Sequence, residues 1–198
     1  MDAVRLGSLL GSRLCHDVIG PASAVVNGLE LIEAEGGMDD EALAMIRSSA
    51  TQLTNRLQFY RAAYGVAAGL GFLDARRIAA GFLTGGKIVL DWPATALPKD
   101  APEGAAKLLL NMVLLGADLL GRGGRLMVAA TATRLAVAAQ GEATRVEDLA
   151  YAQADATTEA TITPRSIQPF FVACLAATLG ARFQAAPGQG RVALDAAF

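Results

Sequence analysis

The sequence contains one histidine, His16, and an aspartate, Asp17, follows it directly. An imidazole has a pKa near ~6.5, so it is largely uncharged at neutral pH and can act as a nitrogen nucleophile. Asp17 could orient the ring through a hydrogen bond, accept a proton during a reaction, or be a solvated helix carboxylate. Because an exposed imidazole can accept a phosphoryl group from a high-energy donor and pass it on, the pair is a candidate phosphoryl-transfer site.

Two other kinds of site are disfavoured by the rest of the sequence. A metal site would need further histidine or cysteine ligands at a regular spacing, and Cys15 and Cys174 do not provide one. A serine-hydrolase site would need a G-x-S-x-G turn, which the sequence lacks. We therefore expect no metal site and no cofactor of the protein's own.

An amphipathic helix is predicted from about Val4 to Glu35, because apolar residues recur there in steps of three and four. At about 100° per residue, His16 lies roughly 200° around this helix from Leu14 and points away from the apolar stripe. The stripe comprises Leu6, Leu10, Leu14, Val18, Pro21, Val25, Leu29 and Ile32. The outward side comprises Leu9, Ser12, His16, Ile19, Gly20, Ser23 and Asn27.

Gly20 and Pro21, which follow His16 on the same helix, favour access to its ring. Gly20 lies one turn further on and adds no side chain, although a glycine costs a helix about 1 kcal/mol against alanine. Pro21 bends the helix and frees the backbone carbonyl of Asp17. We therefore expect the imidazole to be open to a partner.

A second helix is predicted after the turn "EGGMDDE", with Asp39 or Asp40 as its N-cap. Its apolar residues follow a strict alternation of steps of three and four: Leu43, Ile46, Ala50, Leu53, Leu57, Tyr60 and Tyr64. Two helices joined by a short turn form an antiparallel hairpin, which has too little core to stand alone. We expect a second copy to complete a dimeric four-helix bundle, with residues 1–66 as the dimerisation domain.

The glycine-rich stretch 65–74 ends the helical repeat, and a mixed pattern follows in residues 74–198. Helices are predicted at 74–86, 102–120 and 166–180, and strands at 87–93, 124–133 and 134–142. Residues 146–164 are ambiguous between helix and loop, and 181–198 form a hairpin around Pro187–Gly190. The predicted fold class is α+β, with a helical hairpin followed by an α/β sandwich.

Composition narrows the possible partners and locations. The formal net charge is −2 and no basic run occurs, so nucleic-acid binding is not expected. The most apolar segment, 105–120, is shorter than the ~20 residues of a membrane span. The N-terminus does not resemble a signal peptide, and the sparse cysteines fit a reducing compartment, so we expect a cytoplasmic protein without a membrane partner.

Residues 16–21, H-D-V-I-G-P, resemble the H-box of sensor histidine kinases, including its proline five residues after the histidine. The order of hairpin and α/β domain is also similar to the kinase core. Residues 107–120 lie where the kinase N-box helix is expected, and 169–198 resemble the end of a kinase ATPase domain. The resemblance therefore extends over nearly the whole chain.

The chain departs from the kinase pattern at the ATP-binding motifs. Leu115 and Gly116 stand where kinases have the metal-binding asparagine and the following alanine, and Asn111 matches only an earlier, less critical asparagine. The D-x-G-x-G box and the glycine-rich lid are missing from 147–171, and "GQG" at 188–190 is a lone pattern in a predicted turn. We expect no ATP binding, because no carboxylate, metal ligand or glycine loop is available for it.

A chain of this kind, with the histidine kept and the ATP groups lost, resembles the ChpT-type histidine phosphotransferases of α-proteobacterial cell-cycle phosphorelays. The segment "ITPRSIQPFFVACLAATLGARF", residues 162–183, is similar to that family in particular. The resemblance implies a homodimer whose His16 takes phosphate from the receiver domain of a CckA-type hybrid kinase. It passes the phosphate to response regulators of the CtrA and CpdR types, with Mg²⁺ bound by the receiver.

We predict a receiver-docking surface around His16 on the outward side of the first helix. It comprises Ser12, Arg13, Ile19, Gly20, Ser23 and Asn27, with Arg56 and Phe59 added because both lie off the seam of the second helix. Arg13 and Arg56 could steer an acidic receiver or be solvated charges.

Three alternative functions remain open at this point. An active histidine kinase would bind ATP. A compact monomeric phosphotransfer domain of the H-x-x-K-G type would match Gly20, but Ile19 replaces its lysine and the second domain would be unexplained. A non-catalytic dimeric adaptor or kinase inhibitor would keep its activity after His16→Ala.

Overall fold

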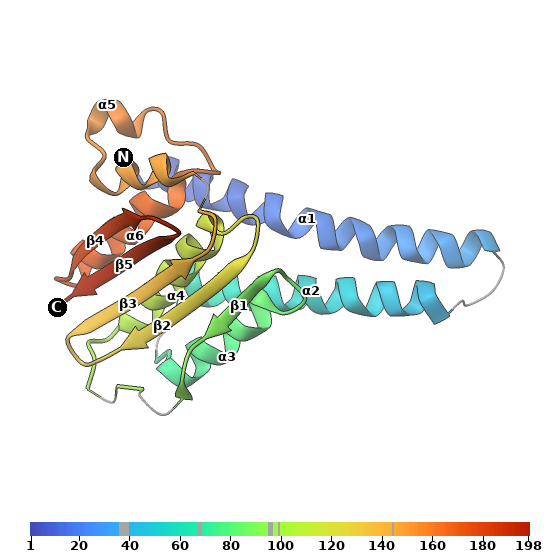
Figure 1. Ribbon diagram of the computed structural model, residues 1–198. Coiled ribbons are helices and arrows are strands. Elements are labelled where there is room, and N and C mark those ends of the chain that lie inside the picture. Colours follow the sequence, from blue (N-terminus) through green and yellow to red (C-terminus); the bar gives the residue numbers. More distant parts are fainter. Residues whose placement is uncertain (36–39, 67–68, 95–96, 99, 144) are drawn as a thin grey trace.

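A long helical hairpin projects from a body of sheet and helices (Figure 1). The computed structural model describes residues 1–35, 40–66, 69–94, 97–98, 100–143 and 145–198. Helices α1 (Ala3–Glu35) and α2 (Asp40–Tyr64) run antiparallel and pack along each other. Asp39, one of the two predicted N-caps, lies outside the described residues, and Asp40 is the first residue of α2.

The body is built on a mixed five-stranded sheet with the order β1-β2-β3-β5-β4. The strands are β1 (Ile88–Asp91), β2 (Gly124–Ala130), β3 (Arg134–Gln140), β4 (Arg182–Gly188) and β5 (Arg191–Ala197). β1 and β2 are parallel and are connected through a helix, whereas the other neighbours are antiparallel. Buried and more exposed residues alternate along much of β2 and β5, as expected for a sheet covered on one face.

Helices α3 (Phe72–Leu83), α4 (Ala105–Leu119) and α6 (Ile167–Thr178) pack against the sheet (Figure 1). The ambiguous segment forms a 3-10 helix, η2 (Val146–Gln153), and a short helix, α5 (Ala156–Glu159), beside the start of α1. The predicted α+β class, a helical hairpin followed by a layered sheet-and-helix body, is confirmed.

The body and the base of the hairpin share one hydrophobic core. Most residues of α4 are buried, because this helix is covered by the sheet, by α6 and by the hairpin. Phe59, Tyr60, Ala62 and Ala63 of α2 belong to the same buried cluster. The shared core fixes the base of the hairpin against α4. The division of the chain into domains 1–66 and 74–198 stays a prediction.

The outer part of the hairpin has only its own two helices for a core. A Cβ atom at Gly28 would lie 2.5 Å from Cγ1 of Ile46, so the glycine permits a close approach of the two helices. Val26, Leu29 and Leu57 nevertheless stay 52%, 50% and 45% exposed in the single chain. Among the described residues, no helix is long and apolar enough to cross a bilayer.

Candidate functional site

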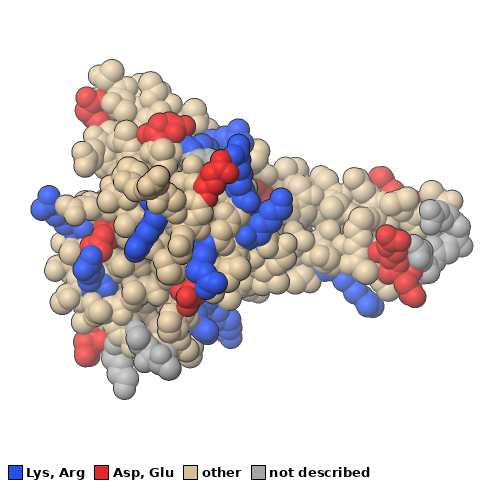
Figure 2. Space-filling view, viewed as in Figure 1, with Lys and Arg blue, Asp and Glu red and all other residues tan. Residues whose placement is uncertain are grey.

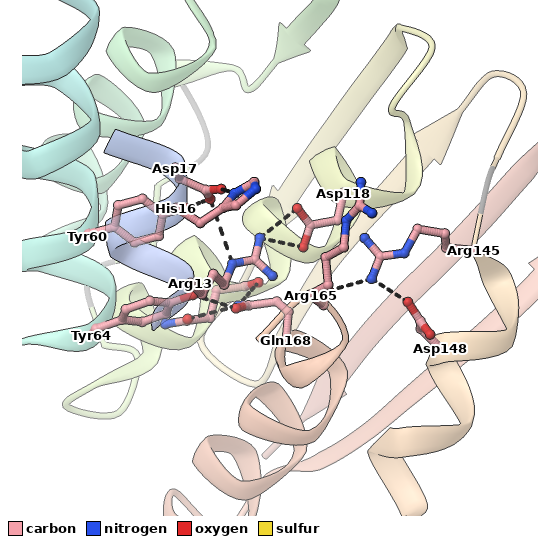
Figure 3. A network of polar contacts seen from close by, with 11 residues as sticks. Arg13, His16, Asp17, Tyr60, Tyr64, Asp118, Arg145, Asp148, Arg165 and Gln168 are labelled. Atoms are coloured by element: carbon pink, nitrogen blue, oxygen red, sulfur yellow. Dashed lines mark hydrogen bonds and ion pairs between the residues drawn. The ribbon is translucent and has the colours of Figure 1, made fainter. Parts of the chain in front are cut away.

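His16 lies on α1 close to the point where the hairpin meets the body (Figure 3). Its side chain is 78% exposed, whereas Leu14 on the other side of the helix packs against the core. The predicted outward orientation of the imidazole is therefore confirmed, and its phosphorylation stays a prediction.

Asp17 holds one nitrogen of the His16 ring. The Nδ1 atom of His16 lies 3.1 Å from Oδ1 of Asp17. A neutral ring that donates its Nδ1–H to this carboxylate carries its free lone pair on Nε2. The contact thus defines which nitrogen is available as a nucleophile.

The carboxylate of Asp17 is itself held from the second helix. The hydroxyl of Tyr60 donates a hydrogen bond to Oδ2 of Asp17 (Figure 3). Burial raises the pKa of the Tyr60 phenol, and the Asp17 carboxylate raises it further, although Arg13 opposes the shift. The phenol therefore remains a protonated donor at neutral pH.

Arg13 joins the site to the body through an ion pair with Asp118 of α4. One terminal nitrogen of Arg13 lies 2.7 Å from each oxygen of Asp118, and Nε of Arg13 lies 3.9 Å from Oδ2 of Asp17. Burial lowers the pKa of Arg13, but Asp118, Tyr64 and Tyr60 together raise it above its usual value, so the guanidinium stays charged.

The prediction of Arg13 as an exposed docking residue is wrong. Its side chain is only 7% exposed, and its counter-charge is Asp118 of α4, which is 24% exposed. The partner lies 105 residues further along the chain, so no local pattern could reveal it. Arg13 is a structural contact between the hairpin and the body.

A cavity of about 620 Å³ opens beside His16, between α1 and the body. It is lined by Ser12, Arg13, His16, Asp17, Asp118, Arg145, Thr163, Pro164 and Arg165. Arg145 has a left-handed backbone with φ of 58°, and its side chain is held by Asp148 and by the backbone carbonyl of Arg165. Two arginines of the body thus face the histidine across the cavity (Figure 3).

Figure 2 shows basic side chains gathered at the junction of hairpin and body, with acidic side chains among them. Sequence reasoning did not identify Arg145 or Arg165, because they lie about 130 and 150 residues after His16 and belong to no periodic pattern. The only indication in the sequence was that Arg165 lies in the segment 162–183, which is similar to the ChpT-type family.

The remaining residues of the predicted docking surface on α1 are exposed. They are Ser12, Ile19, Gly20, Ser23 and Asn27, and Ile19 is 63% exposed. A Cβ at Gly20 would meet no described atom within 4 Å, so the space beside this glycine is open. Ser12 alone among them lines the cavity with His16, and the others continue along α1 toward the tip of the hairpin.

The prediction of Phe59 as a docking residue is also wrong. Phe59 is 0% exposed and stacks on Phe82 of α3, with 4.2 Å between ring centroids. The prediction assumed that α2 packs on one side only, but its C-terminal part also packs against α3 and α4. Arg56 is half-buried, with its guanidinium 5.6 Å from the centre of the Phe82 ring, and its role in docking stays a prediction.

A second cavity, of about 330 Å³, lies on the other side of Asp17. Asp17 and Asp118 line both cavities, and Arg56 and Lys87 line this one. Asp17 and Asp118 therefore lie between the two cavities at the base of the hairpin.

Asn111, the remnant of the kinase N-box, has a structural role. It is fully buried, and its amide nitrogen donates to the backbone carbonyls of Ala63 and Lys107, each at 2.9 Å. Gln168 of α6 donates to its side-chain oxygen at 3.0 Å, and Tyr64 donates to Gln168 at 2.8 Å. These bonds tie α2, α4 and α6 together and occupy the Asn111 amide.

The model of the histidine phosphotransferase C-terminal domain matches residues 72–191 of this chain. This domain follows a hairpin that exposes one histidine. The chain therefore belongs to the histidine phosphotransferase family. It is 38% identical over 189 residues to "Protein phosphotransferase ChpT" of Brucella abortus (strain 2308), covering 91% of this chain and 89% of that protein.

A solved structure titled as a 1.7 Å structure of a bacterial phosphotransferase also matches, with a TM-score of 0.80 and 33% identity. The alignment covers 99% of this chain and 97% of that one. The resemblance to the ChpT-type family noted from the sequence is confirmed.

Proposed function

We propose that this protein relays phosphoryl groups between receiver domains through Nε2 of His16. The exposed imidazole whose Nδ1 is held by Asp17 is the observation that carries the proposal. A hybrid-kinase receiver of the CckA type, phosphorylated on its aspartate, is the donor. Response-regulator receivers of the CtrA and CpdR types are the acceptors.

The transfer is a single displacement at phosphorus. The Nε2 lone pair forms the N–P bond while the acyl O–P bond of the donor breaks, and its electron pair returns to the receiver carboxylate. The Nδ1 proton stays between the ring and Asp17, whose negative charge offsets the positive charge that develops on the imidazole. Transfer to an acceptor is the same step in reverse, and Mg²⁺ in the receiver neutralises the phosphoryl oxygens.

The surroundings of His16 fit a receiver as partner. Receiver phosphorylation pockets are acidic, and Arg145 and Arg165 line the opposite wall of the cavity. The exposed side chains of Ile19, Ser23 and Asn27 extend the surface along α1. A relay must release each partner, so we expect weak and transient docking.

The proposal includes that the chain does not phosphorylate itself from ATP. The amide of Asn111 is already bonded to Ala63, Lys107 and Gln168, so it is not free to hold a nucleotide-bound metal.

The exposed apolar side chains Val26, Leu29 and Leu57 of the hairpin support a homodimer. The free cysteines, Cys15 and Cys174, fit a cytoplasmic location.

The test uses three incubations of the purified protein. With labelled ATP alone, we expect no label on the chain. With a phosphorylated hybrid-kinase receiver, we expect acid-labile, base-stable label that moves on to an added response-regulator receiver. His16→Ala abolishes this label, whereas a variant that still supports the same relay would make the protein an adaptor instead.

A further inference from the structure

We infer that Tyr60 is a positioning residue for phosphoryl transfer, acting through Asp17 to set the tautomer and direction of the His16 ring. The inference rests on the proposed role of His16. Both oxygens of Asp17 are engaged: Oδ1 lies 3.1 Å from Nδ1 of His16, and Oδ2 accepts the Tyr60 hydroxyl. The carboxylate is thus fixed from behind while it holds the ring in front.

Tyr60 is suited to this task because its side chain is tightly packed. Its side chain is 1% exposed and belongs to the shared core. Phe59, Tyr64 and Phe82 surround its ring, with centroid distances of 5.9, 5.1 and 6.1 Å. By contrast, Asp17 and His16 are 24% and 78% exposed, so without this anchor water would compete for the carboxylate.

The chemistry explains why this anchoring matters. A free imidazole exchanges its proton between both nitrogens, and only the Nδ1–H form offers a lone pair on Nε2. When the N–P bond forms, positive charge develops on the ring, and an ionised Asp17 stabilises it. The Tyr60 hydrogen bond occupies Oδ2 and keeps Oδ1 directed at Nδ1.

Arg13, one turn before Asp17 on α1, places a positive charge near the carboxylate. Its Nε lies 3.9 Å from Oδ2 of Asp17, and its terminal nitrogen is fixed by Asp118 at 2.7 Å. At this distance the positive charge attracts the Asp17 carboxylate but does not replace the Tyr60 hydrogen bond. The orientation of the histidine therefore depends on residues of α2 and α4 as well as on its own helix.

The chain allows a direct test, because its only imidazole is His16. ¹⁵N NMR of the unphosphorylated protein at a pH above the imidazole pKa reports the tautomer without any transfer step. Tyr60→Phe removes one hydroxyl. Tyr64→Phe is the matched control, because it removes a partly buried hydroxyl one turn away that bonds Gln168 instead. The rate of label transfer from a phosphorylated receiver is measured on the same samples.

We expect the wild type and Tyr64→Phe to show the Nδ1–H tautomer, and Tyr60→Phe to show a mixture of both tautomers. Tyr60→Phe slows transfer about tenfold relative to Tyr64→Phe, as for loss of one hydrogen bond to a charged group. If Tyr60→Phe does not fold, Asp17→Asn on the half-exposed surface of α1 must show the same tautomer mixture.

The inference is overturned if Tyr60→Phe keeps the Nδ1–H tautomer, or if Tyr64→Phe slows transfer equally. Either result leaves the proposed function intact as long as the wild type transfers label and His16→Ala does not. Failure of the wild type to accept label would instead refute the proposed function, whatever the tautomer.

Discussion

Replacing Asp118 with alanine tests how the hairpin is held on the body. The Arg13 side chain is 7% exposed and the Asp118 side chain 24%, with both carboxylate oxygens at 2.7 Å from the guanidinium. Breaking a buried ion pair by removing one partner typically costs about 3–5 kcal/mol. We expect ~3 kcal/mol for Asp118→Ala, at the lower end because Asp118 is partly solvated and Asp17 lies near the stranded cation.

Urea unfolding at fixed protein concentration measures this loss, because the proposed homodimer would make the stability depend on concentration. Far-UV circular dichroism follows the helices, and the fluorescence of Trp92, the single tryptophan, follows the core of the body. The shared core predicts that both signals change together. In a double-mutant cycle, Arg13→Met combined with Asp118→Ala should cost ~2 kcal/mol less than the sum of the single changes. An Asp118→Ala variant within about 0.5 kcal/mol of the wild type would refute the reasoning.

Three further substitutions separate docking from folding. Gly20→Ala should raise the free energy of unfolding by up to about 1 kcal/mol, because a Cβ there meets nothing within 4 Å. The same change should slow label transfer several-fold, because the methyl group enters the docking surface. Unchanged transfer would show that Gly20 is not part of that surface. Phe59→Ala should cost about 4 kcal/mol in urea unfolding, as for other buried aromatic residues; a near-neutral result would mean that the ring is not in the core. Asn111→Leu should lower the free energy of unfolding by about 2–3 kcal/mol, because it leaves buried polar partners unpaired. A nucleotide titration should give the same result for this variant as for the wild type. Loss of an ATP-binding signal would contradict the structural role of Asn111.

The sequence predicted those features that depend on local periodicity. The stripe on α1 fixed the direction of His16 because a helix repeats its geometry at every residue. The steps along α2 likewise predicted the second helix of the hairpin. Asp17 was identified as a possible holder of the ring, although the two oxygens were not assigned.

Contacts between distant segments could not be predicted in the same way. Phe59 lies off the apolar repeat of α2, which predicts an exposed side chain. The repeat of one helix does not show that α3 packs on its other side. Arg13 was expected to face solvent, because its partner Asp118 belongs to a helix predicted only as apolar. Arg145 and Arg165 reach the site from irregular segments of the body, where neither helix nor strand periodicity applies.

The central claim is that the exposed Nε2 of His16 carries the phosphoryl group between proteins. Its most direct test is to map the phosphorylated residue after incubation with a phosphorylated receiver, by mass spectrometry of peptides kept at alkaline pH. The account predicts one modified site, His16 phosphorylated on Nε2, that forms only when the phosphorylated receiver is present. Phosphate on another residue, or on His16 after incubation with ATP alone, would contradict it.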